Sequence, residues 1–318
     1  MGSDNAPQSL LEALFALSLS LSKTVELIAI GCPDLASLAL EKGLSFEVAP
    51  EVIGMDENPL FALRKKKNAS LCVGLRLLKE GFLDAFVSGG NTGALVSASK
   101  ILLGTFPGIR RPALLALIPT KKQPVAILDV GANVDVKASQ LVQFARLGTA
   151  YQRVRGIAHP RLGILNIGSE ASKGTAETRL AYKALKDFPF FAGNIEGKSV
   201  FDGDVDVLIT DGFTGNVFLK TAEGIASLIL DRLQSHSTEE SMKEMRPHFD
   251  DLQRHLHYTK HPGALLCGVK KIVVKCHGYS TLEAFTNAVL GAADFLTNDF
   301  LNEFSRILMS GQVKDSFS

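Results

Sequence analysis

Four short segments of this sequence combine glycine with amide, hydroxyl and carboxylate side chains, and each follows an apolar run. Glycine lets a backbone approach a ligand closely, and the first N–H groups of a helix attract anions such as phosphate. Because a helical pattern follows each segment, together they predict a site for a phosphate group. The segments are residues 88–93, 129–135, 166–170 and 210–216.

Turns between strands and helices favour the same residue types without any ligand, and for a single segment this reading stays open. In an open parallel sheet, however, ligands bind where the carboxyl ends of the strands meet. If each apolar run is a strand of one sheet, all four segments leave it at that edge. We therefore expect them to converge on one site.

The elements that must position these segments are short β-branched runs alternating with longer stretches of helical period. Several runs are apolar on both faces, as in a mostly parallel sheet covered by helices on both faces. The pattern predicts an α/β fold of this kind. Predicted strands are 25–30, 85–88, 114–118, 125–130, 163–167, 207–210 and 272–275, and predicted helices are 92–103, 137–151, 174–185 and 282–308.

The organisation of the 318 residues is predicted to be one α/β body over 1–318, with two subdomains as a variant, since no linker is visible. Residues 227–261 differ, being polar and interrupted by Pro247. We interpret this segment as two helices that project from the body and join near 237–246. A single irregular surface excursion is the alternative.

Composition narrows the function classes. Lys plus Arg number 34 and Asp plus Glu 33, so the charge balance gives no reason to expect a nucleic-acid partner. The four cysteines form no C-x-x-C pair, so no zinc or redox motif is present, and reduced thiols indicate the cytoplasm. The early apolar run at 10–21 is too short to span a bilayer. We expect peripheral membrane contact at most.

The sequence resembles the fatty acyl-[acyl-carrier-protein]:phosphate acyltransferases, the PlsX family of bacterial phospholipid synthesis, over nearly its whole length. DVGAN and TDGFTGN, in this order and spacing, are the most specific strings. The resemblance lies in MGSDNAP (1–7), RKKKNAS (64–70), SGGNTGAL (88–95), ILDVGANVD (127–135), ILNIGSEASKG (164–174), DVLITDGFTGNVFLKTAEG (206–224) and KCHGYS (275–280).

This resemblance implies an isocitrate/isopropylmalate dehydrogenase-like fold and a homodimer bound peripherally at the inner face of the membrane. It implies transfer of an acyl group from acyl carrier protein to inorganic phosphate, without a metal or redox cofactor. The acyl phosphate would pass to a glycerol-3-phosphate acyltransferase.

Two departures from the family are visible. Relatives have an apolar strand before the first motif, so we expect the natural start to lie upstream of Met1. At the tip of the projection only Met242 and Met245 are apolar, which weakens the expected membrane contact.

The implied reaction needs donors for the oxyanion on the carbonyl, a place for phosphate and help for the departing thiolate. Asn91 and Asn133 are the predicted oxyanion donors, and His277 the predicted proton donor to the thiolate. A turn-forming role for Asn91 and a capping or packing role for His277 stay open. Predicted phosphate-binding residues are Gly90, Thr92, Gly93, Lys173, Thr214, Gly215, Asn216 and Lys220, the two lysines having surface solvation as their alternative.

The carrier protein is acidic, so a nearly neutral enzyme must meet it with a local basic patch. The densest basic run predicts that patch, and a solvated helix face is its alternative. The run is Arg64, Lys65, Lys66 and Lys67.

Two other functions stay open. A phosphate acetyltransferase-like enzyme that uses coenzyme A thioesters needs similar phosphate and oxyanion sites. A noncatalytic membrane-associated scaffold would use the helical projection alone.

Overall fold

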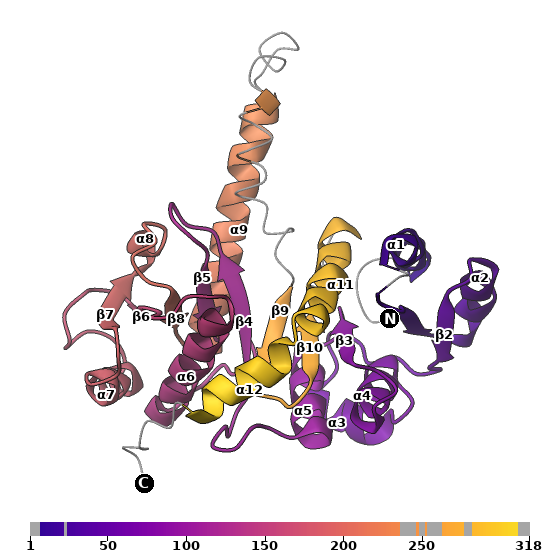
Figure 1. Cartoon of the computed structure of the whole chain (residues 1–318), viewed down its shortest axis with the longest axis horizontal. Coiled ribbons are helices and arrows are strands. Elements are labelled where there is room, and N and C mark those ends of the chain that lie inside the picture. Colours follow the sequence, from indigo (N-terminus) through magenta and orange to yellow (C-terminus); the bar gives the residue numbers. More distant parts are fainter. Residues whose placement is uncertain are drawn as a thin grey trace. The chain divides into compact units, whose positions relative to one another are not determined.

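The computed structural model describes residues 7–21, 24–235, 246–247, 252, 263–276 and 282–310. The chain divides into two compact units (Figure 1). Unit 1 comprises Met1–Leu114 and Pro262–Gln312, and unit 2 comprises Leu115–His261 and Val313–Ser318. The prediction of one body, with two subdomains as its variant, stays a prediction.

Unit 1 contains two groups of paired strands. β1 (Ile28–Gly31) pairs in parallel with β2 (Ser45–Val48). β10 (Ile272–Lys275) pairs in parallel with β3 (Ala85–Ser88) and antiparallel with β9 (Ala264–Cys267). In the first of these ladders Lys275 lies opposite Ser88, so the carboxyl ends of β10 and β3 are neighbours.

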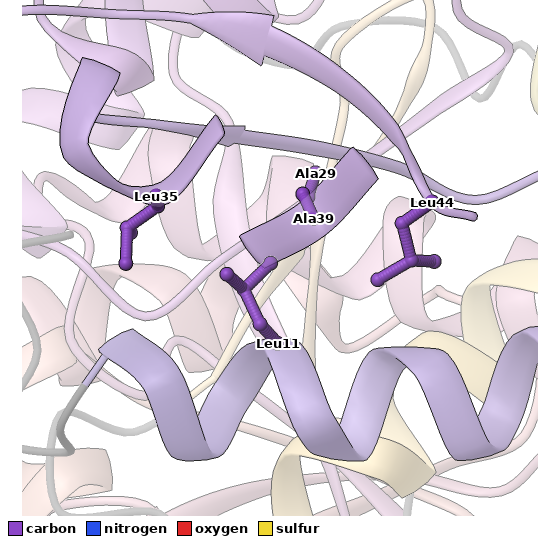
Figure 2. Close-up of a cluster of buried hydrophobic side chains, with 5 residues drawn as sticks. All are labelled: Leu11, Ala29, Leu35, Ala39 and Leu44. Atoms are coloured by element: carbon purple, nitrogen blue, oxygen red, sulfur yellow. The ribbon is translucent and has the colours of Figure 1, made fainter. Parts of the chain in front are cut away.

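The helices of unit 1 pack against these strands. Figure 2 shows Leu11 of α1 pointing toward Ala29 of β1 and Ala39 of α2, with Leu35 and Leu44 on either side. Each fully buried leucine stabilises the fold by about 1.5–3 kcal/mol. The helices are α1 (Pro7–Leu21), the 3-10 helix η1 (Pro33–Leu35), α2 (Ala36–Glu41), α3 (Pro59–Lys65), α4 (Ser70–Glu80), α5 (Thr92–Leu103), α11 (Leu282–Thr297) and α12 (Phe300–Ser310).

A cavity of about 700 Å³ lies in unit 1, and both β1 and β3 line it. Apolar side chains of α1 and α11 form further walls, among them Leu14 and Val289. Within this unit α1 contacts α11 and α4 contacts β1. Among the described strands β1 does not pair with β3. The helix contacts connect the β1–β2 pair to the rest of unit 1 instead.

Unit 2 has the strand order β4-β5-β8-β6-β7. β4 and β5 are antiparallel, whereas the pairs β5–β8, β8–β6 and β6–β7 are parallel. Four strands therefore end at the same edge. All residues of β4, β5 and β8 are buried, as in a sheet covered on both faces. The strands are β4 (Ala113–Ile118), β5 (Val125–Leu128), β6 (Leu162–Asn166), β7 (Phe191–Glu196) and β8 (Val207–Ile209).

The helices of unit 2 follow the strands, and the last of them is the longest. They are α6 (Ala138–Val154), α7 (Ala176–Leu185), α8 (Gly197–Val200) and α9 (Gly212–Ser235). In Figure 1, α9 extends well beyond the strands of its own unit. Residues 227–235 of the predicted projection form the end of α9, and most of 236–261, with Met242 and Met245, lies outside the described residues. Among the described helices none is both long and apolar enough to cross a bilayer.

The elements confirm most sequence predictions. The strands at 85–88 and 272–275 and the helix at 92–103 have the predicted bounds. The single helix predicted over 282–308 is wrong, because α11 and α12 are separated at Asn298 and Asp299, and Asp299 has a φ of 50°. A left-handed residue cannot continue a right-handed helix.

Candidate functional site

Two of the four predicted loops contact each other in unit 2. The N–H of Gly212 donates to the carbonyl oxygen of Asn133 at 2.7 Å, and that of Asp129 donates to the carbonyl oxygen of Thr210 at 3.1 Å. These bonds exist because β5 and β8 are parallel neighbours whose carboxyl ends release the two loops together. The loops at 129–135 and 210–216 therefore form one surface.

The close approach of α9 to the first loop depends on glycine. A Cβ on Gly215 would lie 2.0 Å from the carbonyl oxygen of Asp129, and one on Gly212 would lie 2.6 Å from that of Asn133. Both obstacles are backbone atoms, which cannot rotate away as a side chain does. The lack of a side chain at Gly215 therefore allows α9 to pack closely against the 129–135 loop.

A buried carboxylate, which the sequence analysis did not select, shapes the 129–135 loop. Asp129 accepts hydrogen bonds from the N–H groups of Ala132 (3.1 Å) and Asn133 (2.6 Å) and from the Asn133 side-chain amide (2.9 Å). The DVGAN string was its signal in the sequence. Asn133, a predicted oxyanion donor, is therefore held in place through Asp129.

The start of α9 differs from its predicted role. Asp211 accepts hydrogen bonds from the N–H and the hydroxyl of Thr214 (2.7 and 2.8 Å), and its carbonyl accepts from the N–H of Gly215 (2.9 Å). The helix cap thus uses the donors that the sequence assigned to phosphate. Asn216 is exposed, borders Gly131, and makes no side-chain hydrogen bond among the described residues.

The third loop of unit 2 is compact and carries Lys173. Asn166 donates to the carbonyl oxygen of Lys173 at 3.2 Å, and Asn194 donates to that of Glu170 at 2.8 Å. Lys173 is exposed and forms no ion pair within the described part of the chain. Its ammonium is therefore available to an anion.

Glu177, in the first turn of α7, connects the helix after this loop with α6, the helix after the first loop. It accepts hydrogen bonds from the N–H of Ala138 (2.8 Å) and from the Lys137 ammonium (3.3 Å), at the start of α6. The Ala138 N–H, followed by Lys137, lowers the pKa of Glu177. The helices that follow the first and third loops, α6 and α7, are thus linked at their starts in unit 2.

Lys220, the second predicted counter-charge, forms an ion pair with Glu223 on the same helix. This pairing compensates much of its charge. Lys173 is the better candidate of the two lysines to attract phosphate.

The fourth loop, at 88–93, belongs to unit 1. Its Asn91 is only 6% exposed and caps α5 by accepting a hydrogen bond from the N–H of Ala94 at 3.0 Å. Its amide donates to the carbonyl oxygens of Gly54 (3.2 Å), Met55 (2.9 Å) and Glu57 (3.2 Å). Because these contacts occupy the side chain, it positions the loop and is not placed to donate to an oxyanion.

The backbone at the start of α5 keeps donors for an anion. The first N–H groups of a helix have no acceptor within it, and among the described residues Thr92 and Gly93 have none elsewhere. The N–H of Gly90 donates to the Ser88 hydroxyl at 3.2 Å. Thr92 and Gly93 therefore keep N–H groups that are available to an anion in unit 1. Their role in binding phosphate, and the convergence of this loop with the other three, stay predictions.

Replacing Asn91 with alanine is expected to lower the free energy of unfolding by about 2 kcal/mol, since it removes a helix cap and three hydrogen bonds to partly buried carbonyl oxygens. Asn91→Asp keeps the cap oxygen but places a carboxylate against three carbonyl oxygens, so we expect it to destabilise the protein more. Urea unfolding measures both variants. Stabilities equal to that of the parent chain would contradict the assigned role.

The predicted carrier-binding run separates into two groups. Lys66 donates to the carbonyl oxygen of Val52 (2.7 Å) and to the Glu57 carboxylate (2.5 Å). This Lys66 hydrogen bond is the main cause that lowers the pKa of Glu57. Lys66 therefore holds the 52–57 segment, and the prediction that it binds the carrier loses its support.

The rest of the run lies on an exposed surface with apolar side chains. Leu60 and Phe61 of α3 are 56% and 58% exposed, and the Lys65 ammonium lies 4.5 Å from the centre of the Phe61 ring. We call this surface the α3 patch. It consists of Leu60, Phe61, Arg64, Lys65 and Lys67.

His277 and the residues of the first motif up to Ala6 lie outside the described residues. The predicted role of His277 therefore stays a prediction. Within the described residues no group of three His, Cys, Asp or Glu side chains is arranged to hold a metal ion.

The chain is similar to known proteins over nearly its whole length. Residues 1–303 match a family described as "Fatty acid synthesis protein". The chain is 40% identical over 309 residues to a phosphate acyltransferase of Chlamydia caviae, with 92% of each chain covered. It is 39% identical over 319 residues to a phosphate acyltransferase of Clostridium perfringens, with 96% of this chain and 94% of that protein covered.

Solved structures share the fold at low sequence identity. A phosphotransacetylase from Streptococcus pyogenes aligns with a TM-score of 0.59 at 18% identity, covering 91% of both chains. The EutD phosphotransacetylase from Staphylococcus aureus gives a TM-score of 0.57 at 17% identity, covering 91% of this chain and 92% of that one. The predicted α/β fold with a mostly parallel sheet is confirmed.

Proposed function

The chain belongs to the phosphate acyltransferase family, and on this basis we propose that it transfers a fatty acyl group from acyl carrier protein to inorganic phosphate. A phosphate oxygen attacks the thioester carbonyl, and the carbon–sulfur bond breaks. The products are an acyl phosphate and the carrier thiolate, which takes up a proton to become the free thiol. The similarity to phosphate acyltransferases across nearly the whole chain is the observation that carries this proposal.

Phosphate is assigned, within each unit taken by itself, to groups that have no competing partner among the described residues. These are Lys173 and Asn216 in unit 2 and the N–H groups of Thr92 and Gly93 in unit 1. Phosphate is already nucleophilic, so binding and orientation supply much of the acceleration without a dedicated base. Asn133, fixed by Asp129, remains the proposed oxyanion donor, and His277 the proposed proton donor to the thiolate.

The α3 patch is the proposed docking surface for the acidic carrier. Its cations supply charge complementarity, and Leu60 and Phe61 supply apolar contact area beside them. The patch is close to the anion-binding loop in its own unit, because Pro59 at the start of α3 touches Gly93. A carrier bound there would approach the start of α5.

Neutralising Arg64, Lys65 and Lys67 together is expected to raise the KM for the carrier thioester about tenfold at low salt and to flatten its salt dependence, because charged rims mainly steer association. Initial rates at several ionic strengths measure this. The matched control neutralises three exposed lysines elsewhere in unit 1, Lys79, Lys100 and Lys270. Equal effects of the two triple substitutions would show that net charge alone is responsible.

The homodimer that the family resemblance implies has a suitable surface on α9. Five of its apolar side chains are exposed at intervals that fall on one side of the helix. A second copy of the chain would remove them from water. They are Phe213, Val217, Ile225, Leu228 and Ile229. Peripheral membrane contact, a cytoplasmic location and transfer of product to a glycerol-3-phosphate acyltransferase are proposed from the resemblance alone.

The proposed function is tested by incubating the full chain with phosphate and a long-chain acyl-carrier thioester in the presence of a chelator. We expect an acyl phosphate, trapped as a hydroxamate by hydroxylamine. A parallel reaction with an acetyl-coenzyme A thioester tests the acetyltransferase alternative. Product from coenzyme A alone would favour that alternative, and no product from either thioester would favour the noncatalytic scaffold.

A further inference from the structure

Unit 1 contains a buried cation for which the sequence analysis proposed no role. Lys275, the last residue of β10, is only 8% exposed. Moving an ammonium group out of water is costly unless hydrogen bonds compensate it. The hydrogen bonds of the Lys275 ammonium therefore indicate which part of the fold this buried charge holds in place.

The Lys275 ammonium holds the glycine loop at 88–93. It donates to the carbonyl oxygens of Gly89 (3.0 Å) and Gly90 (2.6 Å). The register of the β3–β10 ladder explains the contact, because Lys275 lies opposite Ser88 and the loop begins immediately beyond. On the other side of the turn, the Ser88 hydroxyl accepts the N–H of Gly90 at 3.2 Å.

The direction of these carbonyls determines where the next N–H points. A trans peptide unit is planar, with its carbonyl and its N–H on opposite sides. The Gly90 carbonyl faces Lys275, so the N–H of Asn91 in the same peptide unit points away from Lys275. The N–H groups of Thr92 and Gly93 follow at the first turn of α5.

We propose that Lys275 is a positioning residue for phosphate: it turns the Gly89 and Gly90 carbonyls inward and so presents the N–H groups at the start of α5 to the anion. This inference rests on the proposed function, which places phosphate at that loop. Asn91 fixes the loop from its other end through the 54–57 carbonyls. Hydrogen bonds from a charged donor are stronger than neutral ones, which suits a loop of flexible glycines.

The test compares Lys275→Met with Lys270→Met, which removes the same charge from an exposed lysine just before β10. We expect Lys275→Met to raise the KM for phosphate about tenfold or more, while the KM for the acyl-carrier thioester changes by less than about twofold. Lys275→Arg, which keeps a cationic donor, should recover part of the loss. Lys270→Met should leave both constants unchanged.

The outcomes separate this inference from the proposed function. If the parent chain makes no acyl phosphate, the proposed function is wrong. An active parent chain and a folded Lys275→Met variant with an unchanged KM for phosphate would overturn the role of Lys275 alone. If thermal unfolding shows that Lys275→Met is not folded, Ser88→Ala decides, because it releases the same turn from the opposite side. A raised KM for phosphate in that variant supports the inference, and an unchanged one contradicts it.

Discussion

Replacing Gly215 with alanine should destabilise unit 2 by about 3 kcal/mol and abolish measurable turnover. The added Cβ would lie 2.0 Å from the carbonyl oxygen of Asp129 and 2.8 Å from the Thr210 methyl carbon. Overpacking typically costs about 1–3 kcal/mol, and a backbone obstacle places this variant at the upper end. Since α9 must then move away from the 129–135 loop, Asn216 and Asn133 would lose their alignment.

A matched substitution on the same helix controls for the change from glycine to alanine. At Gly224 no heavy atom other than those of the adjoining helix backbone lies within 4 Å of the position that a Cβ would occupy, so Gly224→Ala should stabilise the helix by about 0.5–1 kcal/mol. Urea unfolding and initial rates are measured for both variants. A Gly215→Ala protein as stable and active as Gly224→Ala would show that the two loops do not form one surface.

Replacing Asn216 with alanine should lower turnover by about 10² to 10³ fold, the loss typical when one hydrogen-bond donor to the charged reacting groups is removed. The side chain is exposed and makes no hydrogen bond among the described residues, so stability should change by no more than about 0.5 kcal/mol. If Asn216→Ala loses activity while its free energy of unfolding is unchanged, Asn216 acts on the substrate and not on the fold.

Thr221→Ala is the control for Asn216, because Thr221 is an exposed polar residue of the same helix. Its turnover should equal that of the parent chain. If Asn216→Ala behaves like Thr221→Ala, the amide has no part in the reaction and Lys173 is left as the assigned phosphate ligand of unit 2.

Strands that carry the loops could be predicted from the sequence, whereas strands that depend on a neighbour could not. β3 and β10 are apolar runs that end at a change of residue type, which fixes their bounds. β2 is largely exposed, and β7 contains Gly193 at a φ of 90° beside a register shift in the β6–β7 ladder. The polar–apolar alternation of β2 spans only four residues, and Gly193 interrupts β7, so the sequence pattern alone does not identify either segment as a strand.

The sequence predicted the positions of the candidate site. It did not predict which of their side chains are free to bind a substrate and which are occupied by hydrogen bonds within the protein. Asn91 is bonded to carbonyls 34–37 positions earlier in the chain, and sequence spacing contains no information about such partners. The same holds for Lys66, whose partner Glu57 lies on a different segment. The buried roles of Asp129 and Lys275 could not be predicted either. A charged residue at the end of an apolar run is equally typical of the start of a solvent-exposed loop.

The most direct test of the proposed transfer follows radiolabelled phosphate and the acyl group in one reaction of the full chain with a long-chain acyl-carrier thioester. We predict that label and acyl group appear together, in equal amounts, in a hydroxylamine-sensitive product, and that Asn216→Ala loses this product. Release of free fatty acid without label in any acyl product would contradict the account, because the thioester would then be passed to water and not to phosphate.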